Sequence, residues 1–135
     1  MLLLALAALV ASPGCAAVDG DTLSCRSAKR LHRTYIRLNG IDAPEMPGHC
    51  AKGRVCVAGD PIASKDNLAS LIDGKRVTWR SFGKDKYGRT LANPAAGGVN
   101  LSCAQLKGGF AQYWKEWDNK GRTARVCHVS PALSR

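Results

Sequence analysis

Two pairs of acidic residues lie in the first half of a strongly basic chain. Before Asp60 the only acids are Asp19, Asp21, Asp42 and Glu45, although the chain holds 20 Lys and Arg residues against 10 Asp and Glu residues. Asp42 and Glu45 lie in the segment IDAPEMPG, whose two prolines stiffen the backbone and hold both carboxylates in fixed places. Oxygen ligands without Cys or His favour a hard cation such as Ca²⁺ or Mg²⁺. The two pairs could therefore form a metal site.

Arginine side chains beside these acids would complete a site for phosphodiester chemistry. Arg33, Arg37 and Arg89 are candidates, and the segment Asp85–Arg89 places Lys, Tyr and Arg at a turn. The planar fork of arginine matches the oxygens of a phosphate. A carboxylate can take a proton from water while arginine and a cation offset the charge that grows on the phosphoryl oxygens. A simpler interpretation is that the acids cap turns or form surface ion pairs and that the charged turn is only solvated.

Short strands are expected to position these side chains. Thr22–Cys25 and Arg33–Leu38 are rich in strand-forming residues, and an Asn-Gly pair ends the second of them. Val77–Phe82 and Thr90–Ala92 flank the turn GKDKYG, which predicts a hairpin. The acids and arginines thus lie at or just after the ends of predicted strands.

Two helices are predicted from their caps. Asp60 is a good N-cap, with Pro61 at the first helical position, and Gly74 ends this helix. Asn100 can cap a second, shorter helix over Leu101–Lys107, which a Gly-Gly pair stops. Both helices carry apolar residues that can pack on the strands.

The C-terminal part, Asp118–Arg135, has little helical pattern and is expected to be a loop. Strands, a helix, more strands and a helix in one small unit predict a closed or partly closed barrel with helices packed on it. The length of 135 residues, 45% of them hydrophobic, suits a single domain with one core.

The net charge indicates an anionic partner. A formal charge of +10 and a pI near 9.7 attract polyanions, so nucleic acid or an anionic membrane is the natural partner, unless the charge serves solubility alone. A membrane-active protein would need a basic amphipathic helix, and neither predicted helix supplies one.

The N-terminal residues 1–17 are predicted to be a signal peptide. An uncharged apolar run is followed by Pro13, Gly14 and small residues, and it is too short to span a bilayer. The protein is therefore expected to be exported to the periplasm or the extracellular space. Lipoprotein processing at Cys15 is an alternative that the preceding residues fit poorly.

The cysteine content agrees with export. Six cysteines in so short a chain would pair in an oxidising compartment. Removal of the leader takes Cys15 away and leaves an odd number, so one thiol is expected to stay free. A zinc site is the alternative, although its spacing matches none of the short paired-ligand patterns. Its ligands would be His49, Cys50, Cys56 and His128.

Four ordered blocks of sequence resemble one known family. VDGDTL at Val18–Leu23, RLNGIDAPE at Arg37–Glu45, DKYGRTLA at Asp85–Ala92 and VNLSCAQLKGGFA at Val99–Ala111 are similar to the staphylococcal nuclease (thermonuclease) family. The resemblance extends to about Tyr113. It implies an α+β, mainly β fold over residues 18–135, a five-stranded OB-fold barrel with packed helices whose C-terminal helix is short or absent. It also implies a monomeric, Ca²⁺-dependent hydrolase of DNA and RNA with little sequence preference.

The resemblance implies a role for each matching residue. Arg37 and Arg89 correspond to the catalytic arginines of the family and Glu45 to its general base. The calcium ligands correspond to Asp21, Asp42 and the backbone carbonyl of Ala43, with Asp19 behind them. Contacts to substrate are implied for Lys86 and Tyr87, at a terminal phosphate, and more loosely for Tyr113, at a base. Tyr113, Trp114 and Trp117 could stack on bases or could equally belong to the core.

A non-catalytic OB-fold module that binds single-stranded nucleic acid is the alternative function. Such a module should lack one or more of the catalytic or metal positions, and this chain keeps all of them.

The resemblance also frames an expectation about disulfides. Cys50 and Cys56 would close a short loop near the site, and Cys103 and Cys127 would tie the second helix to the tail in place of the family's longer third helix. Cys25 would then be the free thiol.

Overall fold

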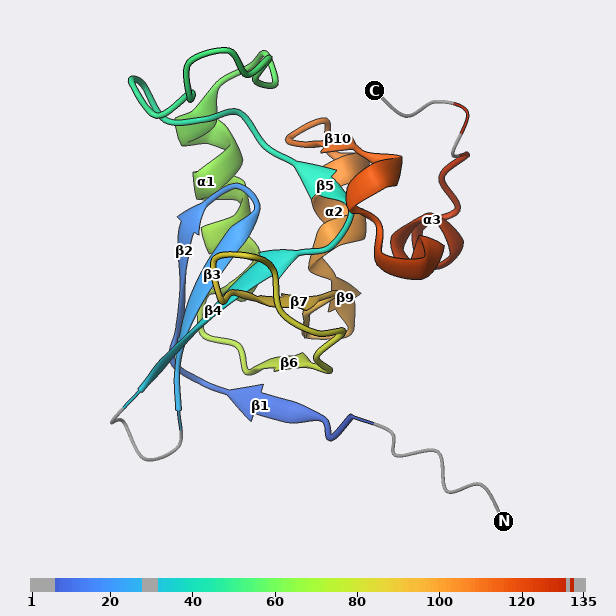
Figure 1. Ribbon diagram of the computed structural model, residues 1–135. Coiled ribbons are helices and arrows are strands. Elements are labelled where there is room, and N and C mark those ends of the chain that lie inside the picture. The colour runs from blue at the N-terminus through green and yellow to red at the C-terminus, as the bar shows by residue number, and fades with distance from the viewer. Residues whose placement is uncertain (1–6, 28–31, 131, 133–135) are drawn as a thin grey trace.

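The computed structural model describes residues 7–27, 32–130 and 132 as a mixed α+β domain in which strands predominate (Figure 1). In chain order its regular elements are β1 (Val10–Ser12), β2 (Cys15–Asp19), β3 (Thr22–Arg26), β4 (Arg33–Leu38), β5 (Ile41–Asp42), α1 (Pro61–Ile72), β6 (Val77–Trp79), β7 (Thr90–Ala92), β8 (Ala95–Ala96), β9 (Val99–Asn100), α2 (Leu101–Lys107), β10 (Gln112–Tyr113) and α3 (Arg122–Cys127). Two 3₁₀ turns, Lys115–Trp117 and Asn119–Gly121, precede α3.

One sheet carries Arg37 and also positions Arg89, which directly precedes its last strand. Its strand order is β2-β3-β4-β7, with β2, β3 and β4 antiparallel and β7 parallel to β4. The register sets Arg37 on β4 opposite Leu91 on β7, so Arg89, just before β7, lies close to Arg37 along this seam. The predicted strands Thr22–Cys25 and Arg33–Leu38 are confirmed, the first of them one residue longer.

The remaining strands form two further sheets, with the orders β1-β6-β8-β9 and β10-β5. Within the described ranges the hydrogen-bond ladders of the three sheets do not join into one closed ring.

The predicted hairpin of Val77–Phe82 with Thr90–Ala92 is confirmed only next to its turn. β6 pairs with β1 and β8 rather than with β7, whereas β7 pairs with β4 on one side. On its other side β7 pairs with the residues before the turn: Phe82 N donates to Leu91 O at 2.7 Å, Leu91 N donates to Gly83 O at 2.9 Å, and Lys84 and Thr90 form an antiparallel bridge. The Asp85–Arg89 turn itself is closed by a hydrogen bond from Asp85 N to Arg89 O, at 2.9 Å.

The two predicted helices are confirmed, with their caps. The Asp60 side chain accepts hydrogen bonds from Ile62 N and Ala63 N at the start of α1, and Gly74 follows its end with a positive φ of 66°. The Asn100 side chain accepts from Cys103 N at the start of α2.

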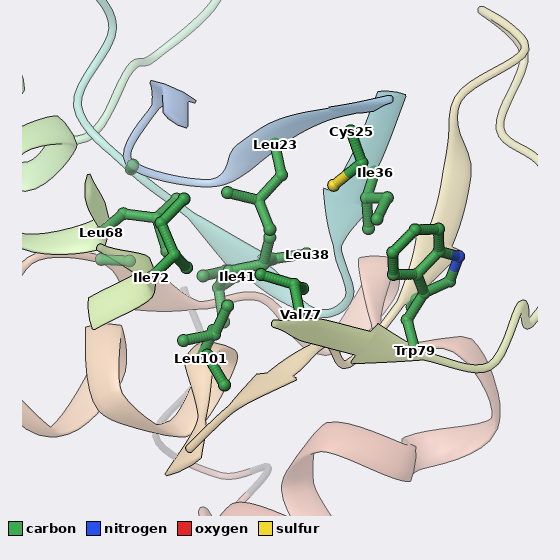
Figure 2. Close-up of a cluster of buried hydrophobic side chains, with 14 residues drawn as sticks. Leu23, Cys25, Ile36, Leu38, Ile41, Leu68, Ile72, Val77, Trp79 and Leu101 are labelled. Atoms are coloured by element: carbon green, nitrogen blue, oxygen red, sulfur yellow. The ribbon is translucent and has the colours of Figure 1, made fainter. Parts of the chain in front are cut away.

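The core lies between the sheets and the first two helices (Figure 2). Its fully buried members come from every layer and include Leu23, Ile36, Leu38, Ile41, Leu68, Val77 and Leu101. Gly20 shows how closely the layers approach, because a Cβ at this position would overlap Ser64 of α1 and Ala43. Close packing of α1 therefore places the Asp19–Asp21 turn against the end of β5.

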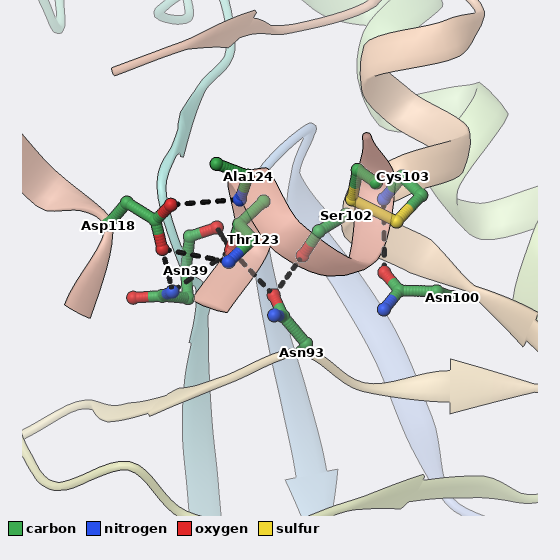
Figure 3. The surroundings of a disulfide bond; sticks show 9 residues. Asn39, Asn93, Asn100, Ser102, Cys103, Asp118, Thr123 and Ala124 are labelled. Carbon is green, nitrogen blue, oxygen red and sulfur yellow. Dashed lines mark hydrogen bonds between the residues drawn. A yellow bond between two sulfur atoms is a disulfide. The ribbon is translucent and has the colours of Figure 1, made fainter. Parts of the chain in front are cut away.

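The expectation of a loop from Asp118 onward is wrong, because α3 forms there, although its six residues agree with the expectation of a short or absent C-terminal helix. Asp118 is buried and accepts from Thr123 N at 2.8 Å and from Ala124 N at 2.9 Å, at the first turn of α3 (Figure 3). The amide of Asn39, at the end of β4, donates to the same carboxylate at 2.8 Å. The N-cap residue of α3 is Gly121, which has no capping side chain, and the buried Asp118 carboxylate binds the free backbone N–H groups in its place.

The disulfides confirm two expectations, and they show how Cys25 pairs in a chain that keeps residue 15. Cys50–Cys56 and Cys103–Cys127 are bonded as expected, but Cys25 is not free, because it is bonded to Cys15 across β2 and β3. With Cys50 and Cys56 bonded to each other, the alternative zinc site is wrong. Cys15 lies inside the predicted signal peptide, so the bridge exists only where residue 15 is retained. No helix in the described ranges is long and apolar enough to cross a membrane.

Replacement of Cys103 and Cys127 by Ser should lower the free energy of unfolding by about 2–4 kcal/mol, because the bridge joins α2 to a helix of only six residues. Urea unfolding measures the loss, and hydrogen exchange should show α3 opening first. The matched control, Cys50→Ser with Cys56→Ser, removes a bridge of smaller sequence separation and should cost less. Equal losses in the two double variants would contradict the proposed anchoring of α3.

Candidate active site

A cavity of about 500 Å³ gathers most of the predicted site residues. Its lining includes Asp19, Asp21, Arg37, Glu45, Arg54, Asp85, Lys86, Tyr87, Arg89, Glu116 and Trp117. Asp42 and Ala43 are buried directly beside it, and Tyr113 does not line it. Residues as far apart in the sequence as Asp19 and Trp117 thus share one pocket.

Arg37 is the buried cation at the centre of the site. It is only 8% exposed, and its Nη1 donates to the carbonyls of Leu38 at 3.0 Å and Ile41 at 2.9 Å. Its Nη2 lies 3.3 Å from Asp21 Oδ2 and 3.8 Å from Asp42 Oδ1. Arg37 therefore holds the Asp19–Asp21 turn and the end of β5 together.

The Asp19-Gly20-Asp21 turn supplies two carboxylates whose pKa values shift in opposite directions. Burial raises the pKa of Asp19 to about 7, and the charge of Asp21 adds to this effect. Burial also disfavours the ionised form of Asp21, but Arg37 and hydrogen bonds from Ala43 N, at 2.8 Å, and Thr22 Oγ1, at 3.0 Å, outweigh it and lower the pKa. Asp21 is thus the ionised member of the pair.

Arg54 is the site residue that sequence reasoning missed. Its Nη2 lies 3.1 Å from both carboxylate oxygens of Asp42, and its Nη1 donates to Glu45 Oε1 at 2.8 Å. Burial and the charge of Asp21 raise the pKa of Asp42, while Arg54 and then Arg37 oppose that rise. The only sequence signal was a basic residue inside the Cys50–Cys56 loop, and its direction could not be predicted.

Arg89 and its neighbours form the opposite wall. The Asp85 carboxylate accepts from Tyr87 N and Arg89 N, each at 2.9 Å, and forms an ion pair with Arg89 Nε at 2.7 Å. Burial alone would raise the pKa of Asp85, but these bonds lower it. Tyr87 is 72% exposed, with Lys86 Nζ and Arg89 Cζ 5.1 and 5.3 Å from its ring centroid. The turn therefore presents two cations and an aromatic face to the pocket.

The aromatic residues near the site divide into two groups. Tyr113 is buried, and its hydroxyl donates to Asp118 Oδ2 at 2.8 Å, so its packing does not favour the predicted contact with substrate. Trp114 and Trp117 stack on each other with centroids 4.2 Å apart. Trp117 lines the pocket, and the guanidinium carbons of Arg37 and Arg54 lie 5.5 and 5.3 Å from its ring.

The predicted cation ligands are neighbours, although nowhere in the described ranges do three Asp, Glu, His or Cys side chains come close enough to enclose a metal ion. Asp21 and Asp42 both contact Arg37, and Ala43 N donates to Asp21. This oxygen-only donor set fits a hard cation that completes its shell with water. Arg37 and Arg54 offset the negative charge that such a cation would neutralise.

Comparison with known proteins gives the family of this mixed α+β domain. The family model described as staphylococcal nuclease homologue matches residues 35–129. The chain belongs to this family.

Three relatives illustrate the similarity. An "uncharacterized endonuclease" of Haemophilus influenzae is 35% identical over 101 residues, which cover 75% of this chain and 51% of the relative. A protein of the same description from Escherichia coli is 31% identical over 102 residues, covering 75% of this chain and 59% of the relative. A "probable staphylococcal-like nuclease" of Oryza sativa subsp. japonica is 34% identical over 96 residues, covering 70% of this chain and 17% of the relative. The chain thus spans about half of these bacterial relatives and a smaller share of the plant one.

Tyr113→Phe tests the buried hydroxyl. Burial, with the hydrogen bond to Asp118, raises the pKa of Tyr113 from 10.0 to about 12. The folded protein therefore keeps a proton that the unfolded chain releases, and this stabilisation is complete below pH 10 and is lost as the pH rises toward 12. At neutral pH the variant should be less stable by about 1–2 kcal/mol. When urea unfolding is measured from pH 8 upward, the difference in unfolding free energy between wild type and Tyr113→Phe should shrink above pH 10.

The exposed Tyr35 of β4 offers Tyr35→Phe as the matched control. A gap between wild type and Tyr113→Phe that stays constant across the whole pH range would contradict the role given to this hydroxyl.

Proposed function

We propose that the protein is a calcium-dependent, largely sequence-nonspecific nuclease that hydrolyses phosphodiester bonds of DNA and RNA. The observation that carries the proposal is the single pocket in which Arg37 and Arg89 face Asp21 and Glu45. Membership of the staphylococcal nuclease homologue family, with relatives named endonuclease and nuclease, supports the same activity.

The arginines act on the phosphate. Arg89 reaches the pocket from a rigid turn, and Arg37 is pre-positioned by two carbonyls and two carboxylates. Donors held in place before the reaction stabilise the charge that develops on the phosphoryl oxygens without reorganisation. Lys86 and Tyr87, at the exposed tip of the same turn, bind a second phosphate of the substrate.

Glu45 activates water. As base, it takes one proton from a water whose oxygen forms the new bond to phosphorus, while the bond from phosphorus to the leaving ester oxygen breaks and that oxygen takes up a proton. Asp21, Asp42 and the Ala43 carbonyl would hold the calcium ion, which supplies positive charge next to the phosphate when bound. The stiff IDAPE segment keeps base and ligands a fixed distance apart.

Further parts of the proposal concern the fold and the cellular location. We infer that the three sheets belong to a five-stranded OB-type barrel, as the family resemblance implies. We also infer an exported, monomeric protein with residues 1–17 as leader. Such a protein would keep the Cys50–Cys56 and Cys103–Cys127 disulfides, which are compatible with export. The alternative remains a non-catalytic module that binds single-stranded nucleic acid.

Digestion of heat-denatured DNA is the direct test of activity. Cleavage should be strong with Ca²⁺, weak with Mg²⁺ and absent with chelator, because Mg²⁺ demands a tighter octahedral shell and does not place the water correctly. Undiminished cleavage in chelator would refute the metal mechanism. No cleavage under any condition would favour the binding module.

Glu45→Gln and Arg89→Lys separate catalysis from binding. Each should lower turnover by about 100-fold or more. Binding of single-stranded DNA, measured by fluorescence anisotropy in chelator, should remain nearly intact in both variants because the other cations stay. Loss of binding in Glu45→Gln at low salt would show that the role assigned to Glu45 is wrong.

The +10 charge predicts how that binding depends on salt. The logarithm of the affinity should fall linearly with the logarithm of the salt concentration, because each neutralised phosphate releases condensed counterions. Lys86→Gln should reduce the slope by about 0.7, the value for one contact to a single strand. An unchanged slope would place Lys86 away from the bound phosphates.

A further inference from the structure

Arg54 has no part in the proposed reaction, yet it binds the two acids that the reaction needs free. Its guanidinium forms ion pairs with Asp42 at 3.1 Å and with Glu45 at 2.8 Å. One of these carboxylates is a proposed cation ligand and the other is the proposed base. Both cannot bind Arg54 and perform those roles at the same time.

The loop that carries Arg54 is a small ring closed by the Cys50–Cys56 disulfide. Within the ring, Arg54 N donates to Ala51 O at 3.0 Å, and Val55, the next residue, is 79% exposed. The ring is thus exposed on its outer side, and Arg54 is the side chain that it directs toward the carboxylates. Ring closure limits the conformations of the loop and raises the effective concentration of the guanidinium at Asp42 and Glu45.

We propose that Arg54 is a built-in counter-ion that competes with the divalent cation for Asp42 and at the same time occupies the base Glu45, and that the Cys50–Cys56 ring sets the strength of this competition. The inference rests on the proposed calcium mechanism. Because Arg54 must leave before the cation binds, the apparent affinity is the intrinsic affinity multiplied by the fraction of molecules in which Arg54 is displaced.

The same competition selects for ion charge. Arg54 supplies one positive charge at Asp42, the carboxylate that the cation would take over. A monovalent ion that replaced Arg54 would gain no Coulomb energy from charge, whereas a divalent ion gains that of a second positive charge. Arg54 therefore excludes Na⁺ and K⁺ and admits Ca²⁺.

The guanidinium also contacts an aromatic ring while it pairs with the carboxylates, and this contact can persist when the ion pairs break. Arg54 Cζ lies 5.3 Å from the ring centroid of Trp117, which is 38% exposed and lines the same pocket. A cation over an indole face is attracted by the ring quadrupole. Displacement thus needs only a small movement within the pocket.

Calcium titration of the nucleic-acid-free protein tests the inference. Isothermal titration calorimetry in about 0.15 M NaCl compares wild type with Arg54→Gln, Arg54→Lys and the control Lys52→Gln, which removes an exposed charge from the same ring. The competition acts as a gate, which is open in those molecules in which Arg54 has left Asp42. If one molecule in ten is open, Arg54→Gln should bind Ca²⁺ about tenfold more tightly than wild type. Arg54→Lys keeps the charge but loses the contact to both carboxylates, so its Ca²⁺ affinity should lie between those of wild type and Arg54→Gln. Lys52→Gln should match wild type.

A double-mutant cycle tests the ring. Cys50→Ser with Cys56→Ser should raise the Ca²⁺ affinity when Arg54 is present and should add nothing in the Arg54→Gln background. An equal effect in both backgrounds would overturn the link between ring and gate.

Thermal unfolding distinguishes a gate from a merely structural contact. In chelator Arg54→Gln should melt below wild type, because Asp42 and Glu45 lose their counter-ion. Saturating Ca²⁺ should raise its melting temperature by more than it raises that of wild type. A structural contact would lower both temperatures equally and leave the affinity unchanged, and that result would overturn the inference.

The outcomes also separate this inference from the proposed function. If wild type binds Ca²⁺ and cleaves DNA but Arg54→Gln binds Ca²⁺ no more tightly, the gate is wrong and the calcium mechanism stands. If neither protein binds Ca²⁺, both fail. Binding by Arg54→Gln alone would support the gate in its strongest form.

Discussion

The buried Arg37 guanidinium is the interaction on which the site depends. A buried cation is stable only when its charge and all its donors are matched, since removing it from water without partners costs several kcal/mol. Here the carbonyls of Leu38 and Ile41 and the carboxylates of Asp21 and Asp42 supply that match. Those partners come from β4, β5 and the turn between β2 and β3. A single side chain therefore requires three separate elements to converge at one edge of the domain, and the pocket forms where they meet.

Local signals explain the elements that the sequence predicted correctly. Asp60 and Asn100 cap α1 and α2 with bonds to residues two or three positions ahead, and strand-forming composition marks β3 and β4. The errors involve partners far apart in the chain. Nothing near α3 indicates that Asp118 will be buried and paired with Asn39, 79 positions earlier. The choice of partner for β6 likewise depends on β1 and β8, which a turn between two strands does not reveal.

The site residues show the same difference between what local sequence signals predict and what depends on distant parts of the chain. Asp21, Arg37, Glu45 and Arg89 could be predicted to share a pocket, because ordered sequence blocks carry them and short, stiff segments hold them. Neither the burial of Tyr113 nor the direction of Arg54 could be predicted. Each depends on how an irregular segment folds back on the domain, and neither proline spacing nor hydrophobic period describes such a segment. The pKa of Asp19 is a further case, since it follows from burial that only the packed domain provides.

The parallel seam between β4 and β7 implies an order of assembly. β2, β3 and β4 are joined by short connections and can pair early, whereas Ile36 meets Thr90 only after more than fifty intervening residues have been placed. Contacts of such long sequence separation form late, because loop closure must precede them. Arg89 consequently joins Arg37 among the last steps of folding. A partly folded or still-emerging chain therefore has the acidic half of the pocket without its second arginine.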